Sequence, residues 1–174
     1  MLRLAAVAAI PAIVMLLGGC APGAAPTPAP TPAFASEAEA FAAAEEVYRA
    51  YNEAGNDRRG GDKSVKPQDF LVGTALEGAI DGQNFLREHD VRLTGVILVM
   101  TFVGEHSAPS EPPVVHALVC LDLSNARTMD ASGNDVTPAD RPTVIAQRVT
   151  FVHDGIKLRI SEEAEGDAES CPSL

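Results

Sequence analysis

Four histidines are the side chains in this sequence whose type most readily binds a transition metal or moves a proton. His89, His106, His116 and His153 lie far apart in the chain, and no two have the spacing that places them on one helical face. Zinc needs several converging ligands, so isolated histidines in loops or at strand edges are the simpler interpretation. The sequence therefore predicts no metal and no cofactor.

A second group with possible chemistry is the polar set Asp130, Asn134, Asp135 and Asp140, which surrounds one expected turn. These residues lack the alternating ligand pattern of a calcium loop, whereas short polar side chains are common in turns because they hydrogen-bond the nearby backbone. The chain also lacks a glycine-rich phosphate loop and a nucleophile elbow. Since no catalytic motif is found, we do not expect an enzyme.

The thiol of Cys20 follows an uncharged, largely apolar run of 16 residues that begins after Arg3. That run is shorter than the roughly 20 residues that span a bilayer, and its small residues near the end are typical of a secretory signal. The four residues "LGGC" that end at Cys20 resemble the bacterial lipobox, whose cysteine is joined to diacylglycerol and becomes the first residue of the mature chain. We therefore expect a lipoprotein signal peptide at residues 1–19, with an ordinary signal and a chance cysteine as the alternative.

Residues 20–35 contain the lipid-attachment cysteine and a linker rich in Pro, Ala and Thr. The linker has no charged residue, so we expect either extended polyproline II or disorder. Two acyl chains suffice for stable anchoring. The expected partner is thus the membrane, and the expected location of the single domain, residues 36–174, is the extracytoplasmic face of the cell membrane.

Cys120 and Cys171 are the two cysteines that remain if Cys20 carries the lipid. Disulfides persist outside the cytoplasm, so the two can form an intramolecular bond that fastens the C-terminal tail to a central strand. Two unpaired thiols or a bond between chains stay open, because the sequence does not show whether the Cα atoms come within about 6 Å.

The composition is acidic. The whole chain has a formal charge of −11, and loss of Arg3 with the signal leaves 12 basic and 24 acidic residues, a charge of −12. Phosphate binding requires a clustered basic surface, and no basic run is present in the sequence. Nucleic acid is therefore not expected as a partner.

The first part of the domain has the pattern of helices. Ser36 and Glu39 have the spacing of a capping box, and apolar residues then recur at intervals of three and four to about Asn52. Pro67 opens a second helical region that several glycines weaken. We expect it to form two shorter helices with a boundary near Gly73.

From Val91 onward the pattern becomes that of β-strands, with four segments rich in Val, Ile, Thr and Phe. Asp154-Gly155 between two such segments predicts a type I′ hairpin, after which Ile156, Leu158 and Ile160 would share a buried face. Helices followed by strands predict an α+β fold, with N-terminal helices packed on a curved four-stranded antiparallel meander.

The first strand is expected to be apolar on both faces. One face would carry Val96, Leu98, Met100 and Phe102, and the other Leu93, Ile97, Val99 and Val103. Only one face can meet the helices, so the other must meet a curled sheet, the C-terminal tail or a second copy of the protein. A homodimer through this sheet face is one expectation.

The order of helix, helix and curved meander resembles the nuclear transport factor 2-like, or cystatin-like cone, fold shared with ketosteroid isomerases and polyketide cyclases. More closely, the chain resembles a group of actinobacterial lipoproteins that carry such a domain, over residues 35–171. The resemblance rests on "EVYRAYNEAGN", "LTGVILVMTFVGEH", "ALVCLDLSNARTMDASGNDVTPADRP" and "VTFVHDGIKLRISE". It implies a fold, a location and the pair Cys120–Cys171, but no catalytic residue.

Cavities of that fold can hold an active site, and ketosteroid isomerases use an Asp base beside a Tyr and a protonated Asp. Tyr48, Tyr51 and Asp122 are the corresponding candidates for polar groups in the cavity. The simpler interpretation is that the tyrosines belong to the core and that Asp122 faces solvent or pairs with Arg148.

Three functions therefore remain open. We expect a non-catalytic lipoprotein whose domain serves for binding or assembly of a ligand that the sequence does not identify. An isomerase-like or cyclase-like enzyme would need Asp122 beside a tyrosine. A carrier of an apolar ligand would need an open cavity, with Phe41, Leu76, Phe85 and Val119 as its expected lining.

Overall fold

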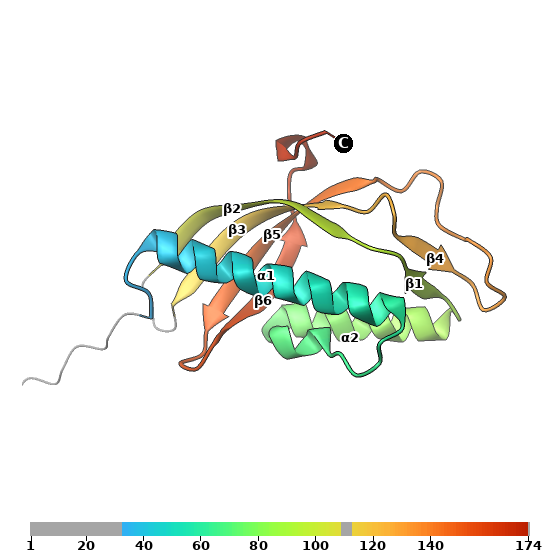
Figure 1. The fold of residues 1–174 in the computed structure, drawn as a ribbon, viewed down its shortest axis with the longest axis horizontal. Helices are drawn as coiled ribbons and strands as arrows, with labels where there is room; N and C mark the ends of the chain where they lie inside the picture. The colour runs from blue at the N-terminus through green and yellow to red at the C-terminus, as the bar shows by residue number, and fades with distance from the viewer. Residues whose placement is uncertain (1–32, 109–112, 174) are drawn as a thin grey trace, which may run out of the picture. The chain divides into compact units, whose positions relative to one another are not determined.

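The computed structural model describes residues 33–108 and 113–173, which lie in the compact unit Thr31–Leu174 (Figure 1). The expected signal peptide, the lipid site at Cys20 and nearly all of the linker lie outside the described residues. Within the described part of the chain, no helix combines the length and apolar character needed to cross a membrane.

Helix α1 spans Glu37–Gly60 and begins as the sequence predicts, with the Ser36 hydroxyl accepting a hydrogen bond from the Glu39 amide at 3.2 Å. The prediction that it ends near Asn52 is wrong, because the helix continues to the left-handed Gly61. The added turns are polar, but they are tied to the segment before β2, because the side-chain amides of Asn52 and Asn56 both donate hydrogen bonds to the Ile97 carbonyl. These tertiary bonds keep a polar segment helical.

The second helical region divides as expected. A 3-10 turn, η1, spans Pro67–Phe70, and helix α2 spans Gly73–Glu88. Gly73 has a φ of 55°, which a glycine adopts at little cost. The junction is fixed to the sheet, because the Val72 amide donates to the Ile160 carbonyl at 2.8 Å.

In the described part of the chain, six strands follow: β1 Arg92–Thr94, β2 Leu98–Ala108, β3 Val114–Asp122, β4 Arg127–Met129, β5 Val144–His153 and β6 Leu158–Glu165. The four long ones form the antiparallel sheet β2-β3-β5-β6, which confirms the predicted α+β meander. Strands β1 and β4 form a separate two-stranded sheet. The expected continuous strand from Val91 is broken at Gly95 (φ 80°), where a Cβ would lie 2.0 Å from the Asn125 carbonyl oxygen.

One face of the four-stranded sheet packs against α1. Buried residues of β3, β5 and β6 alternate along this inner face and meet Ala40, Ala44 and Tyr48. The helix approaches β2 closely at Gly104, where a Cβ would lie 2.3 Å from the Phe41 ring. Small residues on both elements thus permit the close contact.

The predicted faces of the first long strand need correction. A bulge between Val99 and Thr101 shifts the register of β2 against β3. As a result Val99 and Phe102 both pack on the core, although the simple alternation assigned them to opposite faces. Leu98 and Val103 instead lie exposed on the outer face (48% and 53%).

The outer face of β3 and β5 is covered in part by the C-terminal tail, with its 3-10 turn η2 at Ala168–Ser170 (Figure 1). A disulfide joins Cys120 of β3 to Cys171, with Cα atoms 5.6 Å apart, which confirms the expected pair. Gly166 lies against Leu118 and Ala146, where a Cβ would have no room. The C-terminal tail, one of the three partners that the sequence allowed for the outer face, therefore covers part of it.

The β5–β6 hairpin forms where the sequence predicts it, but with a different turn. The Asp154 amide donates to the Lys157 carbonyl, so Gly155 and Ile156 are the central pair. Among the two only Gly155 has a positive φ (90°), which excludes type I′. Ile156 consequently lies in the turn and is exposed, whereas Leu158 and Ile160 are buried as expected.

We expect Cys171→Ala to lower the free energy of unfolding by at most ~4 kcal/mol, because the disulfide closes a loop of 51 residues. The substitution leaves the buried Cys120 sulfur in place, so it does not open a cavity. Urea unfolding of the oxidised protein and of the variant measures the difference, and reduced wild type should match the variant. Equal midpoints, or two alkylatable thiols in the native wild type, would contradict the assignment.

Candidate functional site

A cavity of about 790 Å³ lies between the helices and the inner face of the sheet. It forms because α1 packs on β2, β3 and β6, whereas α2 packs on β6. The α2 residues that line the cavity include the small Ala79 and Gly82, which leave the space between helix and sheet unfilled. Much of the wall is apolar and includes Leu71, Phe85, Leu93, Leu121, Leu123 and Ile145.

The cavity opens to solvent along the C-terminal half of α2. Phe85 lines it and is 56% exposed, with its ring stacked on His89 at a centroid distance of 4.1 Å. Gln83 and Arg87 also line this side and are exposed. Since Tyr48 on the opposite side is 2% exposed, the cavity has an open side and a closed end.

The closed end carries two hydrogen-bonded pairs. The Tyr48 hydroxyl donates to Oε1 of Gln147 at 2.7 Å, and the Tyr51 hydroxyl donates to Oε2 of Glu163 at 3.3 Å. Gln147 comes from β5 and Glu163 from β6, and all four residues line the cavity. We call these four residues the polar end.

Burial controls the protonation of the polar end. It raises the pKa of Glu163, although the hydrogen bond from Tyr51 acts in the opposite direction. Burial first and the Glu163 charge second raise the pKa values of Tyr48 and Tyr51 well above their ordinary value. Both tyrosines therefore stay neutral hydrogen-bond donors at physiological pH, and neither can act as a base.

Of the predicted cavity groups, the structure brings Tyr48 and Tyr51 to the cavity but not Asp122. Asp122 alternates with Leu121, which lines the cavity, so it lies on the other face of β3. Its carboxylate accepts a hydrogen bond from the Ser124 amide at 2.7 Å, which lowers its pKa. The suggested pairing with Arg148 is wrong, because Asp122 lies opposite Val144 whereas Arg148 lies opposite Leu118, four residues away along β3, and lies 4.0 Å from Glu105.

Glu163 is the carboxylate that sequence reasoning missed. It belongs to an acidic segment whose composition is typical of a solvated tail. In the structure, a register shift at Thr150/Phe151 inserts Ser161 as an extra residue in β6. Glu163 therefore shares the inner face with Ile160, which it would not do in regular alternation. No residue type at this point of the sequence signals such a bulge.

The expected apolar lining is only partly correct. Phe85 lines the cavity, whereas Phe41, Leu76 and Val119 pack in or against the core instead. Their packing follows from α1 and the first turns of α2 lying directly on the sheet. The open space is displaced toward the C-terminal ends of both helices, beyond these residues.

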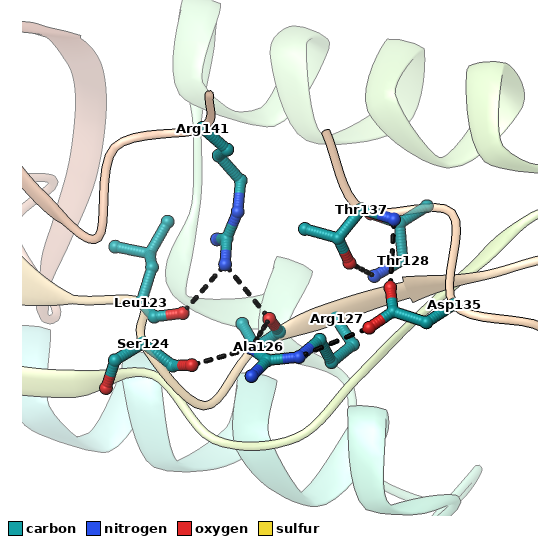
Figure 2. A network of polar contacts seen from close by, with 8 residues as sticks. All are labelled: Leu123, Ser124, Ala126, Arg127, Thr128, Asp135, Thr137 and Arg141. Atoms are coloured by element: carbon teal, nitrogen blue, oxygen red, sulfur yellow. Dashed lines mark hydrogen bonds and ion pairs between the residues drawn. The ribbon is translucent and has the colours of Figure 1, made fainter. Parts of the chain in front are cut away.

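A network of arginines supports the wall at Leu123 (Figure 2). Arg141 donates to the carbonyls of Leu123 and Ala126, each at 3.0 Å, and Arg127 donates to the carbonyls of Ser124 and Ala126. Nε of Arg127 lies 3.4 Å from the Asp135 carboxylate. These bonds hold the segment after β3, which is irregular, in a single position beside the cavity.

The histidines and the acidic turn do not join the cavity lining. His106 and His116 stack on the outer face at 6.4 Å, and Asp130 accepts hydrogen bonds from both the backbone and side-chain nitrogens of Asn134. Turn chemistry thus accounts for the acidic set. Within residues 33–108 and 113–173, no group of three or more His, Cys, Asp or Glu side chains could hold a metal ion.

No protein-family model matches this chain, and no curated protein matches its sequence significantly. The observed architecture is that of an α+β domain with two N-terminal helices on an antiparallel sheet.

The raised pKa of Glu163 predicts how folding stability depends on pH. The folded protein holds this proton more tightly than the unfolded chain, so stability falls as pH rises from the ordinary value of 4.5 through the higher folded value. Glu163→Gln cannot ionise and keeps an acceptor for Tyr51. We expect this variant to gain stability relative to wild type as pH rises across that window, measured by urea unfolding from pH 4 to pH 7.5.

Glu162→Gln is the matched control, because it removes the same charge from an exposed neighbour on the same strand. Its stability difference from wild type should change less with pH than that of Glu163→Gln. If the two variants follow the same curve, burial does not control the Glu163 proton.

Proposed function

We propose that this protein is a membrane-tethered extracytoplasmic lipoprotein whose domain, residues 36–174, is a non-catalytic binding module for a small, largely apolar ligand. The observation that carries the proposal is the open cavity of about 790 Å³ with an apolar wall and a polar end. Binding sites for small molecules commonly enclose about 300–1,000 Å³ and combine apolar walls with a few oriented polar groups.

Two further observations support the location. The disulfide between Cys120 and Cys171 fits an oxidising compartment outside the cytoplasm. The lipobox-like "LGGC" and the proline-rich linker that follows supply an anchor and a spacer. A ligand-binding domain on such a tether would work close to the membrane surface.

The order of the elements also supports assignment to the nuclear transport factor 2-like, cystatin-like cone, fold. In both, helices precede an antiparallel sheet that they cover on one face. Members of that fold use the space between helices and sheet for ligands or for catalysis. The assignment is compatible with a binding module and does not by itself require an enzyme.

A second candidate function is an isomerase-like or cyclase-like enzyme, which the Tyr51–Glu163 pair favours. Glu163 is the one carboxylate among the described lining residues, and burial raises its pKa toward the range useful for a general base. Binding is the better supported function because Tyr51 and Tyr48 already donate their protons to Glu163 and Gln147.

A homodimer through the outer sheet face is a separate proposal. It rests on the exposed Leu98 and Val103 of β2, which the C-terminal tail leaves uncovered. A monomer mass in solution would contradict it without affecting the cavity.

The binding proposal predicts that filling the cavity removes binding. Gly82→Leu places a side chain at a lining position where a Cβ meets no atom within 4 Å. We expect it to weaken binding of the neutral apolar dye N-phenyl-1-naphthylamine by about tenfold, equivalent to ~1.4 kcal/mol. Fluorescence titration measures the affinity.

Gly78→Leu is the matched control, because Gly78 lies on the same helix with equally open space but does not line the cavity. Both variants remove a helical glycine and should stabilise α2 to a similar extent. Dye binding that is equal in the two variants, or undetectable in wild type, would contradict the proposal.

The tether is tested separately. Cys20→Ala should move the protein from the detergent phase to the aqueous phase in detergent partitioning, or leave it with its signal attached, because no acyl chains can be added. Cys171→Ala, which removes a different cysteine, should stay in the detergent phase. An unchanged detergent-phase fraction of Cys20→Ala would contradict lipid anchoring at this residue.

A further inference from the structure

The charge of the cavity lining is opposite to that of the protein. The chain has 13 basic and 24 acidic residues, yet its cavity is lined by four arginines and one acidic residue, Glu163. The four are Arg58, Arg59, Arg87 and Arg92. An acidic protein therefore concentrates positive charge at one cavity.

Three of the four arginines lie where the two helices end. Arg58 and Arg59 lie in the last turn of α1, and Arg87 lies in the last turn of α2. Arg92 is the first residue of β1, the strand that follows α2 and contacts α1. Figure 1 shows the C-terminal ends of α1 and α2 beside β1. We call these four residues the arginine end.

None of these arginines has a carboxylate within 4.0 Å in the described part of the chain. Arg58 donates to the Lys63 carbonyl at 2.8 Å and Arg92 to the Asp130 carbonyl at 3.4 Å. Arg87 donates to the Asn84 side chain at 3.0 Å. These hydrogen-bond partners are neutral oxygens, although Arg58 also lies near enough to Asp62 to contribute to the lowered pKa of that carboxyl.

Arginines elsewhere in the fold behave differently. Arg49, Arg127, Arg148 and Arg159 lie outside the lining, and each lies within 4.0 Å of a carboxylate. Arg141, also outside the lining, holds two backbone carbonyls at 3.0 Å in the wall network. Of the five arginines in the described part of the chain that have no carboxylate within 4.0 Å, four therefore line the cavity and one, Arg141, does not.

Arg59 is the most enclosed member of the arginine end. Its guanidinium donates to Asn56 Oδ1, but its Nε is buried and has no hydrogen-bond partner among the described residues, a property it shares with the Nε atoms of Arg141 and Arg159 outside the lining. Burial also lowers its pKa. Among the four arginines of the lining, Arg59 is the one with such a donor in the described part of the chain, so it is the member best placed to bind a head group inside the cavity.

Resting on the proposed binding function, we infer that the ligand is an amphipathic anion whose apolar body lies along Leu121, Leu123 and Ile145 and whose carboxylate or phosphate head meets Arg59 at the arginine end. Both head groups accept paired hydrogen bonds from a guanidinium. The Arg59 guanidinium folds back over Gly55 toward Tyr51. A negative head seated deeper, beyond Tyr51, would meet the Glu163 carboxylate, which disfavours that position. The tyrosines of the polar end remain available to a hydroxyl or carbonyl group on the body.

The test compares ligands that share one chain and differ in head charge. The protein is the chain from residue 20 onward carrying Cys20→Ala, so that no attached lipid competes. Dodecanoate, monododecyl phosphate, neutral dodecanol and cationic dodecyltrimethylammonium are each titrated below their micelle concentrations at pH 7 and low salt, by displacement of N-phenyl-1-naphthylamine. We expect at least one of the two anions to bind about tenfold or more tightly than dodecanol, and the cation to bind most weakly.

Arg59→Gln should remove at least about tenfold of the anion affinity while leaving dodecanol affinity unchanged. Arg49→Gln is the matched control, because it removes the same charge from the same helix outside the cavity and should change neither affinity. Thermal unfolding of both variants checks that the fold is retained. If Arg59→Gln does not fold, Arg59→Lys, which keeps the charge but loses the paired donors, provides the comparison and should bind the anions less tightly than wild type.

Each outcome separates the inference from the function on which it rests. Equal binding of anions and dodecanol, tighter binding of the cation, or an unchanged anion preference in the Arg59 variant would overturn the inference and leave the binding function standing. Complete displacement of dodecanoate by an equal concentration of inorganic phosphate would also overturn it, because the apolar body would then contribute nothing. Failure of the dye and of all four ligands to bind would overturn the binding function itself.

Discussion

The hydrogen bond from Tyr48 to Gln147 is the interaction on which the cavity depends. The Tyr48 ring lies in the core beside Phe102, while its hydroxyl reaches the central strand β5 at 2.7 Å. A buried hydroxyl without a partner would cost about 1–3 kcal/mol, so this bond fixes the rotation of α1 above the sheet. With α1 so placed, Tyr51 lies one turn further along and meets Glu163. The closed end of the cavity is thus built by the same contact that seats the helix.

Side-chain size then determines where the fold is solid and where it is hollow. At the start of α1 the Phe41 ring lies against Gly104, and Ala40 and Ala44 are fully buried. Toward the other end of the helices, Gly55 and Gly82 line the cavity and supply no side chain to fill it. Residues such as Leu121 and Ile145 therefore face open space although they lie on the core side of the sheet. The cavity therefore results from small residues at a few positions of the helices.

The sequence predicted the features that rest on local chemistry. The Ser36 cap, the break near Gly73, the antiparallel meander and the place of the last hairpin each follow from residue types over a few positions. It did not predict the end of α1, because Asn52 and Asn56 are held by the distant Ile97. It also placed the acidic cavity group at Asp122, since regular alternation assigns Glu163 no special role. One extra residue in β6 brings Glu163 inward, and such a bulge depends on tertiary pairing that spacing alone does not encode.

The acidic composition and the arginine-lined cavity are compatible because they act over different distances. At about 0.15 M salt the Debye length is about 8 Å, so the net charge of −11 contributes little to an anion already at the cavity mouth. There the nearby guanidinium groups determine the potential, and the low polarity of the wall strengthens their effect. The surrounding acidic surface would still repel small hydrophilic anions that gain nothing from the apolar wall. Selection for a ligand that is both anionic and apolar thus follows from combining a negative surface, a positive cavity end and an apolar wall.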